Sequence, residues 1–288
     1  MKTRILTGAI VAMMLSACSI LESEPFSYDC STSTSFTPIA SPVTYTASGS
    51  TTTVFVLHGK TGSPGSPHYN SLLPGLQSAG YDVIAPYMPW SSTTWNGTQC
   101  EGMNYLSGLI EAEKTAGKKV VLLGHSMGGA GALIYLATSN VSGVDAAVTI
   151  APGHFLHHSN LMQSETVDSV SAAQTMVDAG NGDTNDTFYT FNNGTQQAIT
   201  TTANIYLSYH DLNQYPNIVN GVLGVIETPV YWIGGDADNL TTAYGYSSIF
   251  NNIPSNPNSQ YETLSGTHTS VVTNAITPIT TWLGGQGL

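Results

Sequence analysis

Three stretches of the sequence carry side chains that could act together in nucleophilic catalysis. Gly124-His125-Ser126-Met127-Gly128 places a serine between an apolar run and a stretch of small residues. Asp236 and Asp238 follow a later apolar run, and His268 follows another. A serine hydroxyl becomes a good nucleophile when a histidine removes its proton and an acidic side chain orients that histidine. The three stretches therefore indicate a serine nucleophile with a histidine base.

Segments of strand length alternate with segments of helix length, and these elements would position the reactive side chains. Most of the strand-length runs lack apolar–polar alternation, which is typical of parallel strands covered on both faces. They span 52–59, 81–89, 119–126, 144–152, 228–236 and 260–266, with helical stretches at 68–79, 100–116, 127–139, 239–251 and 269–283. The alternation predicts an α/β fold with a mostly parallel, doubly wound sheet.

From about residue 50 to 285 the chain resembles the α/β-hydrolase family. The resemblance rests on HGKTG, GHSMGG, GGDAD and SGTHT, each at the end of an expected strand. In that family the nucleophile sits at a strand-to-helix turn, and the acid and the histidine follow in that order. The resemblance implies Ser126 as the nucleophile, His268 as general base and then acid, and Asp238 as the acid that orients His268. Asp236, nearer the strand end, is expected to cap a turn through backbone N–H groups.

The resemblance also implies an oxyanion hole, formed by the backbone N–H groups of Lys60 and Met127. Lys60 departs from the family pattern, in which an apolar or aromatic residue is common at this position. Two positions are open for its ammonium. It lies at the mouth of the site, where it would favour an anionic group, or it points into solvent.

One interval interrupts the alternation of strands and helices. We expect residues 49–152 and 221–288 to form the hydrolase core and residues 153–220 to form a helical cap insertion over the carboxyl edge of the sheet. Within it, the run SETVDSVSAAQTMVDAG predicts an amphipathic helix ending at a glycine. A polar loop over 180–195 and a second helical stretch over 196–212 are expected to follow.

The N-terminus has the pattern of a secretory signal peptide, spanning residues 1–17. Its end, Leu15-Ser16-Ala17-Cys18, resembles the bacterial lipobox, in which the cysteine is lipidated. The alternative is an ordinary signal with a coincidental cysteine. We expect a protein of the bacterial cell envelope, at the outer membrane or the periplasmic face, that is anchored to the membrane through Cys18. Residues 18–48 are rich in Ser, Thr and Pro and are expected to form a tether, with an edge strand at 43–45.

Cysteine usage fits an oxidising compartment. With Cys18 lipidated, Cys30 and Cys100 remain, and cysteine pairs form disulfides in such compartments. A bridge between tether and core is expected, and two free thiols are the alternative.

The overall composition excludes some functions. Only 8% of the residues are charged, the formal net charge is −12, and six residues are basic, which is too few for a nucleic-acid-binding patch. His154 and His158 have a metal-like i, i+4 spacing, but no third ligand is evident and we expect no metal or other cofactor. His157 is left without a role. His58 and His125, which belong to two motifs, are expected to hold loops.

The sequence therefore predicts a serine hydrolase. Among serine hydrolases it favours a carboxylesterase that acts on a small ester or acyl substrate through an acyl-enzyme. Lipase or amidase/peptidase action with the same residues is the first alternative. A non-catalytic envelope binding protein is the second.

Overall fold

The structure is a computed structural model that describes residues 26–158, 160–192 and 194–288. The expected signal peptide and the lipidation site at Cys18 lie outside these residues. Within the described part of the chain, no helix is long and apolar enough to cross a membrane.

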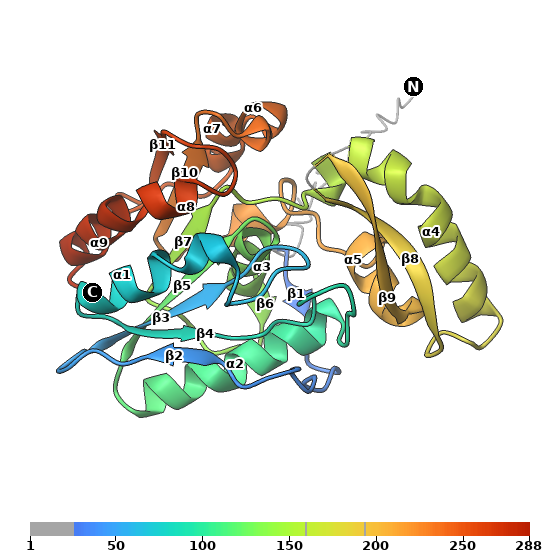
Figure 1. The fold of residues 1–288 in the computed structure, drawn as a ribbon, viewed down its shortest axis with the longest axis horizontal. Coiled ribbons are helices and arrows are strands. Elements are labelled where there is room, and N and C mark those ends of the chain that lie inside the picture. Colours follow the sequence, from blue (N-terminus) through green and yellow to red (C-terminus); the bar gives the residue numbers. More distant parts are fainter. Residues whose placement is uncertain (1–25, 159, 193) are drawn as a thin grey trace, which may run out of the picture.

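A seven-stranded sheet runs through the larger part of the molecule (Figure 1). The strand order is β11-β10-β7-β5-β3-β4-β2, and only β2 is antiparallel to its neighbour. Each of the six expected strand segments contains one parallel strand. The strands are β3 (Thr52–Leu57), β4 (Asp82–Ala85), β5 (Lys119–His125), β7 (Ala146–Ile150), β10 (Val230–Gly235) and β11 (Gln260–Leu264). The predicted α/β fold with a mostly parallel sheet is thereby confirmed.

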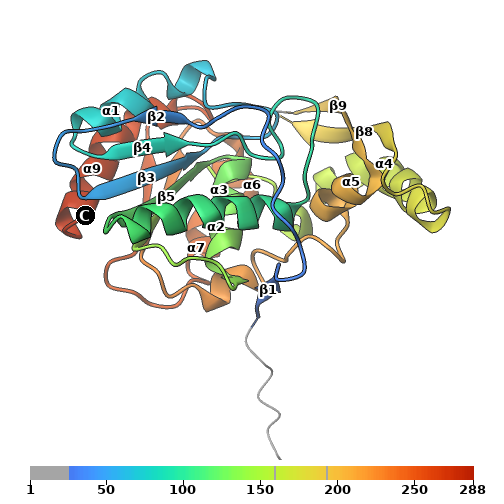
Figure 2. The ribbon, with the colours of Figure 1, turned by 90° about the horizontal axis from the view of Figure 1, so that it is seen from below.

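Helices cover both faces of this sheet (Figure 2). Because side chains alternate along a strand, Val54 and Val56 of β3 enter one core cluster while Phe55 and Leu57 enter the other. The first cluster is closed by α1 (Leu72–Ser78), α8 (Val271–Asn274) and α9 (Ile276–Gly285). The second is closed by α2 (Gln99–Thr115), α3 (Met127–Leu136) and α7 (Tyr246–Phe250). The sheet is therefore doubly wound.

The segment between β7 and β10 forms a separate layer beside the carboxyl edge of the sheet (Figures 1 and 2). Helix α4 (Asn160–Asp178) matches the predicted amphipathic helix, whereas the predicted polar loop over 180–195 and the first part of the predicted helical stretch over 196–212 were wrong. These residues form an antiparallel hairpin of β8 (Asn185–Asn192) and β9 (Thr195–Thr202). The later part of the predicted helical stretch does form a short helix, α5 (Ala203–His210). Phe188 and Thr190 are buried and Tyr189 between them is exposed, as expected for a strand with one packed face and one solvated face.

Residues 26–48 are packed on the core. Strand β1 (Tyr28–Asp29) pairs with β6 (Thr138–Ser139), and β2 (Val43–Tyr45) is the predicted edge strand, paired with β4. A disulfide joins Cys30 to Cys100 at the start of α2. It links the N-terminal segment to the core, as the cysteine count predicts.

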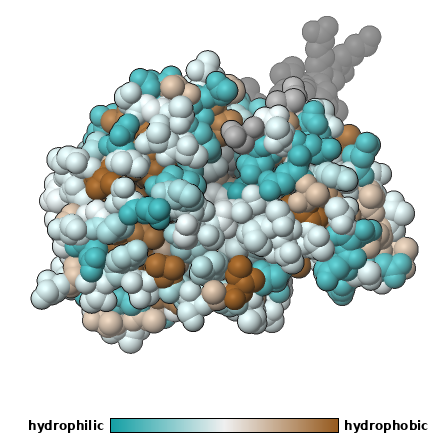
Figure 3. Space-filling view, viewed as in Figure 1, coloured by the Kyte–Doolittle hydropathy of each residue, from teal (hydrophilic) through white to brown (hydrophobic). Residues whose placement is uncertain are grey.

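The surface drawn in Figure 3 is mixed in character. Apolar residues on this face lie in small groups that polar residues separate, as is usual for soluble domains. Among the described residues, the large apolar side chains with the greatest exposure are Ile39, Val167, Tyr189 and Leu212, which come from different elements.

Candidate active site

Ser126 stands at a tight turn between β5 and α3. Its φ of 55° and ψ of −123° are unusual for a residue with a side chain, and this strain projects the hydroxyl from the corner. The flanking glycines are required by close packing. A Cβ on Gly124 would lie 2.0 Å from the carbonyl oxygen of Gly128, and one on Gly128 would lie 2.3 Å from that of Leu57. The G-x-S-x-G spacing thus reflects contact between backbones.

The structure brings Ser126, His268 and Asp238 together in a chain of hydrogen bonds. His268 Nε2 lies 2.9 Å from Ser126 Oγ, and His268 Nδ1 lies 2.8 Å from Asp238 Oδ2. A carboxylate only accepts hydrogen bonds, so Nδ1 carries the proton and Nε2 is free to accept the serine proton. Asp238 is buried, and its other oxygen accepts from the backbone N–H of Leu240 at 2.9 Å. The arrangement can deprotonate Ser126 and stabilise the resulting imidazolium.

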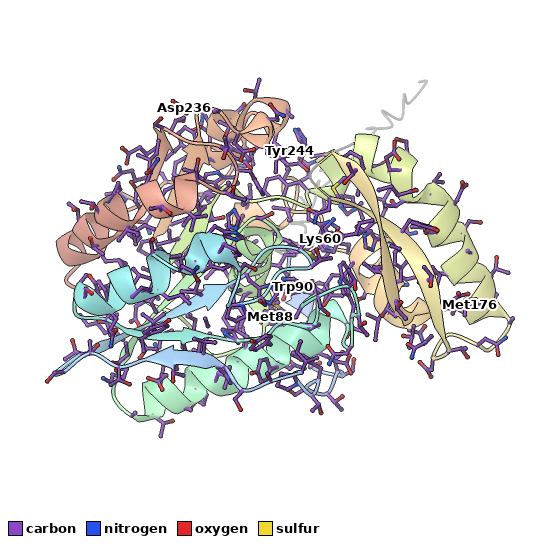
Figure 4. All side chains as sticks on the ribbon, in the orientation of Figure 1. Lys60, Met88, Trp90, Met176, Asp236 and Tyr244 are labelled. Carbon is purple, nitrogen blue, oxygen red and sulfur yellow. A yellow bond between two sulfur atoms is a disulfide. The ribbon has the colours of Figure 1, made fainter. Side chains whose placement is uncertain are left out.

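Asp236 has a different environment. Its side chain is exposed, and Oδ1 accepts from the backbone N–H of Gly266 at 2.8 Å. Figure 4 shows it at the outer end of the sheet, away from the labelled Lys60 between core and cap. This contact ties the turn after β10 to the turn after β11. Asp236 therefore supports the loop that carries His268 without contacting its ring.

The loop after β3 passes directly over Ser126. A Cβ on Gly59 would lie 3.1 Å from the Cβ of Ser126, so the next residue, Lys60, begins beside the hydroxyl. The described residues provide no hydrogen-bond acceptor for the backbone N–H of Lys60 or of Met127. Two unused donors beside a nucleophile can stabilise negative charge on a bound oxygen.

The Lys60 side chain occupies neither of the two expected positions. Its ammonium reaches across to the cap hairpin, where it donates to Thr190 Oγ1 at 3.0 Å and to the carbonyl oxygen of Phe191 at 2.9 Å. No acidic side chain pairs with it among the described residues. Burial lowers the pKa of Lys60 to about 7. Lys60 therefore connects the loop after β3 to the cap hairpin, and it is one of the residues that line the site.

A cavity of about 690 Å³ opens in front of Ser126, between the core and the cap. Its volume is in the range of small-molecule sites. Its lining is mixed: Met162, Leu240, Ala243 and Tyr244 are apolar or aromatic, whereas Lys60, His154, His158 and Asn192 are polar. Sequence reasoning missed Asn192, Leu240 and Tyr244, because no motif marks a cavity wall that the cap and α6 (Asn239–Tyr244) supply together.

The remaining histidines mostly make contacts with backbone groups. His58 Nδ1 donates to Gly59 O at 2.8 Å, and burial lowers its pKa to about 4. His154 Nε2 donates to Tyr209 O at 2.8 Å, and His157 Nε2 to Leu212 O at 2.9 Å. His158 lines the cavity. Across residues 26–288, apart from 159 and 193, no three His, Cys, Asp or Glu side chains gather in a way that could hold a metal ion.

Comparison with known proteins agrees with this architecture. A family model described as the alpha/beta hydrolase fold matches residues 52–193. The chain belongs to the α/β-hydrolase family. A search of curated proteins found no significant match.

Solved structures resemble the chain over most of its length. A monoacylglycerol lipase from Paleococcus ferrophilus is 18% identical with a TM-score of 0.64, and the match covers 85% of this chain and 98% of the other. MenH from S. aureus is 17% identical with a TM-score of 0.61, covering 87% and 100%. Est1E from Butyrivibrio proteoclasticus, solved with ferulic acid bound, is 13% identical with a TM-score of 0.58, covering 85% and 94%. At these identities the likeness establishes the fold, and family membership with such neighbours supports hydrolase activity.

Proposed function

We propose that this protein is a serine hydrolase that cleaves carboxylic esters through an acyl-enzyme on Ser126. The observation that carries the proposal is the hydrogen-bonded series Asp238–His268–Ser126 at the wall of the cavity. No cofactor takes part, and the partner is a small ester or acyl substrate.

In the first half-reaction, Ser126 Oγ attacks the ester carbonyl carbon while His268 Nε2 takes the hydroxyl proton. Asp238 stabilises the imidazolium through its bond with Nδ1. The carbonyl oxygen becomes negative and accepts hydrogen bonds from the N–H groups of Lys60 and Met127. The tetrahedral species then expels the alcohol, which takes the proton from His268, and the acyl group remains on Ser126.

In the second half-reaction a water molecule replaces the alcohol. His268 removes a proton from the water as its oxygen attacks the acyl carbon, and the same two N–H groups stabilise the negative oxygen. When the second tetrahedral species collapses, the proton passes from His268 to Ser126 Oγ and the carboxylic acid leaves. The enzyme returns to its starting state.

The mixed cavity wall favours an ester with one apolar part and one polar part. The cavity has the volume of a small-molecule site, so we expect short acyl chains to be preferred, and lipase action is the second candidate. Lipase action is supported by the similar fold of a monoacylglycerol lipase. Amide or peptide cleavage and non-catalytic binding are the further alternatives.

The function is tested by hydrolysis of p-nitrophenyl esters with acyl chains from acetate to palmitate, together with an anilide of the preferred acid. We expect the highest kcat/KM at short chains, weak or absent anilide cleavage and no activity in Ser126→Ala. A maximum at long chains would instead indicate a lipase, and preferred anilide cleavage an amidase. If every ester and the anilide remain intact, the hydrolase proposal is wrong.

We also propose that the protein is anchored in the bacterial cell envelope through lipidated Cys18. The four residues 15–18 and the preceding apolar run support this location. The experiment is expression in a bacterial host fed an alkyne fatty acid, followed by membrane fractionation of the parent and Cys18→Ser. Label and membrane association should be present in the parent and absent from the variant. Equal fractionation of both proteins without label would contradict the proposal.

A further inference from the structure

Two buried hydrogen bonds and one partly buried hydrogen bond connect the loop over Ser126 to the backbone of His268. The backbone N–H of Gly59 donates to the Tyr69 hydroxyl at 2.9 Å. That hydroxyl lies 2.9 Å from His125 Nδ1, and His125 Nε2 lies 2.8 Å from the carbonyl oxygen of His268. Tyr69 and His125 are 1% and 2% exposed, so solvent has little access to the two bonds of the Tyr69 hydroxyl.

The direction of every proton in this series follows from the chemistry of its two ends. A carbonyl oxygen only accepts, so His125 Nε2 must carry the proton that it shares with His268. Burial, with a smaller contribution from His268 itself, lowers the pKa of His125 well below its usual value, so the ring is neutral. Nδ1 is then an acceptor and receives the Tyr69 proton, while the Tyr69 oxygen accepts from Gly59. No donor or acceptor in the series is left over.

The series ends at Gly59 and at His268, and catalysis requires the loop at Gly59 and the ring of His268 to keep a fixed distance from each other. Gly59 directly precedes Lys60, whose N–H faces the developing oxyanion, and His268 must hold its ring against Ser126 and Asp238. We infer that His125 and Tyr69 are positioning residues, which fix the loop that carries Gly59 and Lys60 relative to the backbone of His268 for catalysis. This inference rests on the proposed function.

The geometry at His268 explains why this contact matters. The two residues before it are held by side chains, Gly266 by Asp236 and the N–H of Thr267 by the Ser270 hydroxyl. His125 holds the carbonyl of His268 itself, whose ring nitrogens are both already used. Small displacements of a general base lower the rate strongly, because proton transfer depends on a hydrogen-bond distance.

Two substitutions at His125 each remove one of the two hydrogen bonds of its ring and can keep the other. In His125→Gln the amide N–H can reach the position of Nε2 and keep the bond to His268, whereas the acceptor for Tyr69 is lost. In His125→Asn the amide oxygen can replace Nδ1 as acceptor for Tyr69, whereas the bond to His268 is lost. We expect His125→Asn to lower kcat for a short p-nitrophenyl ester about tenfold to a hundredfold with KM nearly unchanged. His125→Gln should lose severalfold less.

Tyr69→Phe tests the other end of the series and does not depend on either His125 variant. It should lower kcat about threefold to tenfold, again with little change in KM, because the link between Gly59 and His125 is lost. In the His125→Gln background, where the link is already broken, the same substitution should lower kcat much less. Melting temperatures measured in parallel separate positioning from folding.

Three outcomes would overturn the inference: unchanged kcat in both His125→Asn and Tyr69→Phe, equal losses in the Asn and Gln variants, or losses that follow the melting temperature alone. Failure of the proposed function is distinguishable, because the parent would then neither turn over any ester nor react with a fluorophosphonate at Ser126. Such a result would overturn the inference as well.

Discussion

Asp238 Oδ2 lies 2.8 Å from His268 Nδ1 across two loops that are 30 residues apart in the chain. Asp236, two residues before Asp238, instead bonds the backbone of Gly266. The two aspartates therefore provide a matched comparison, because they lie on the same turn and only Asp238 contacts the His268 ring.

Asp238→Asn should preserve the fold and lower kcat by about 10³–10⁴-fold, because an amide no longer fixes the reactive tautomer of His268 or stabilises its cation. Asp236→Asn should retain most of the activity and lower the melting temperature slightly. Steady-state kinetics and thermal unfolding on both variants check this. A large loss of kcat confined to Asp236→Asn would contradict the assignment.

Lys60 should make stability depend on pH in a defined direction. Its pKa is about 7 in the folded protein and 10.5 in the unfolded chain, so between these values the unfolded chain binds more protons at this group. The free energy of unfolding contributed by Lys60 therefore rises with pH across that window and is lowest below pH 7. We expect the melting temperature of Lys60→Met, relative to the parent, to increase as pH falls from 10 to 6.

Lys119→Met is the control for this pH series, because that lysine is exposed. Its melting temperature relative to the parent should stay constant with pH. If the Lys60→Met difference is equally constant, the Lys60 ammonium is not desolvated as the structure indicates.

Close backbone packing at the serine turn predicts a strong effect of one methyl group. A Cβ at position 128 would lie 2.3 Å from Leu57 O and 2.6 Å from His58 O, neither of which can move without shifting β3. Gly128→Ala should destabilise the protein by about 3 kcal/mol or more and abolish labelling of Ser126. Gly108→Ala, in the middle of α2 with nothing within 4 Å, should leave both unchanged or raise the melting temperature. Urea unfolding of the two variants gives the comparison, and equal stability would contradict it.

The disulfide should stabilise the protein without affecting catalysis. Cys30→Ser with Cys100→Ser removes a link across 70 residues of sequence, which should lower the free energy of unfolding by about 2–4 kcal/mol. Neither cysteine lines the cavity, so kcat/KM at 25 °C should change less than twofold. Denaturant unfolding and ester kinetics on the double variant check this, and a tenfold loss of kcat/KM in a folded protein would argue against it.

The sequence was sufficient to predict the sheet, because runs such as 119–126 are apolar throughout and end at motifs. It was also sufficient to choose Asp238 over Asp236 as the partner of His268. It failed in the cap, where Asn-Gly at 193–194 between Thr-rich runs was the available hairpin signal. The position of the Lys60 ammonium depends on Thr190 and Phe191, about 130 residues away, so no local pattern reveals it. Nothing in the sequence marks Tyr69.

Acylation of Ser126 during ester hydrolysis is tested most directly by the intact mass of the protein. The protein is quenched in acid within milliseconds of mixing with excess p-nitrophenyl butyrate. We expect a species heavier by one butyryl group, mapped to the peptide that contains Ser126 and absent from Ser126→Ala. It should accumulate further in the parent when deacylation is slowed by low temperature. The acyl-enzyme mechanism is wrong if the parent hydrolyses the ester with no acyl adduct at any time and Ser126→Ala hydrolyses it equally well.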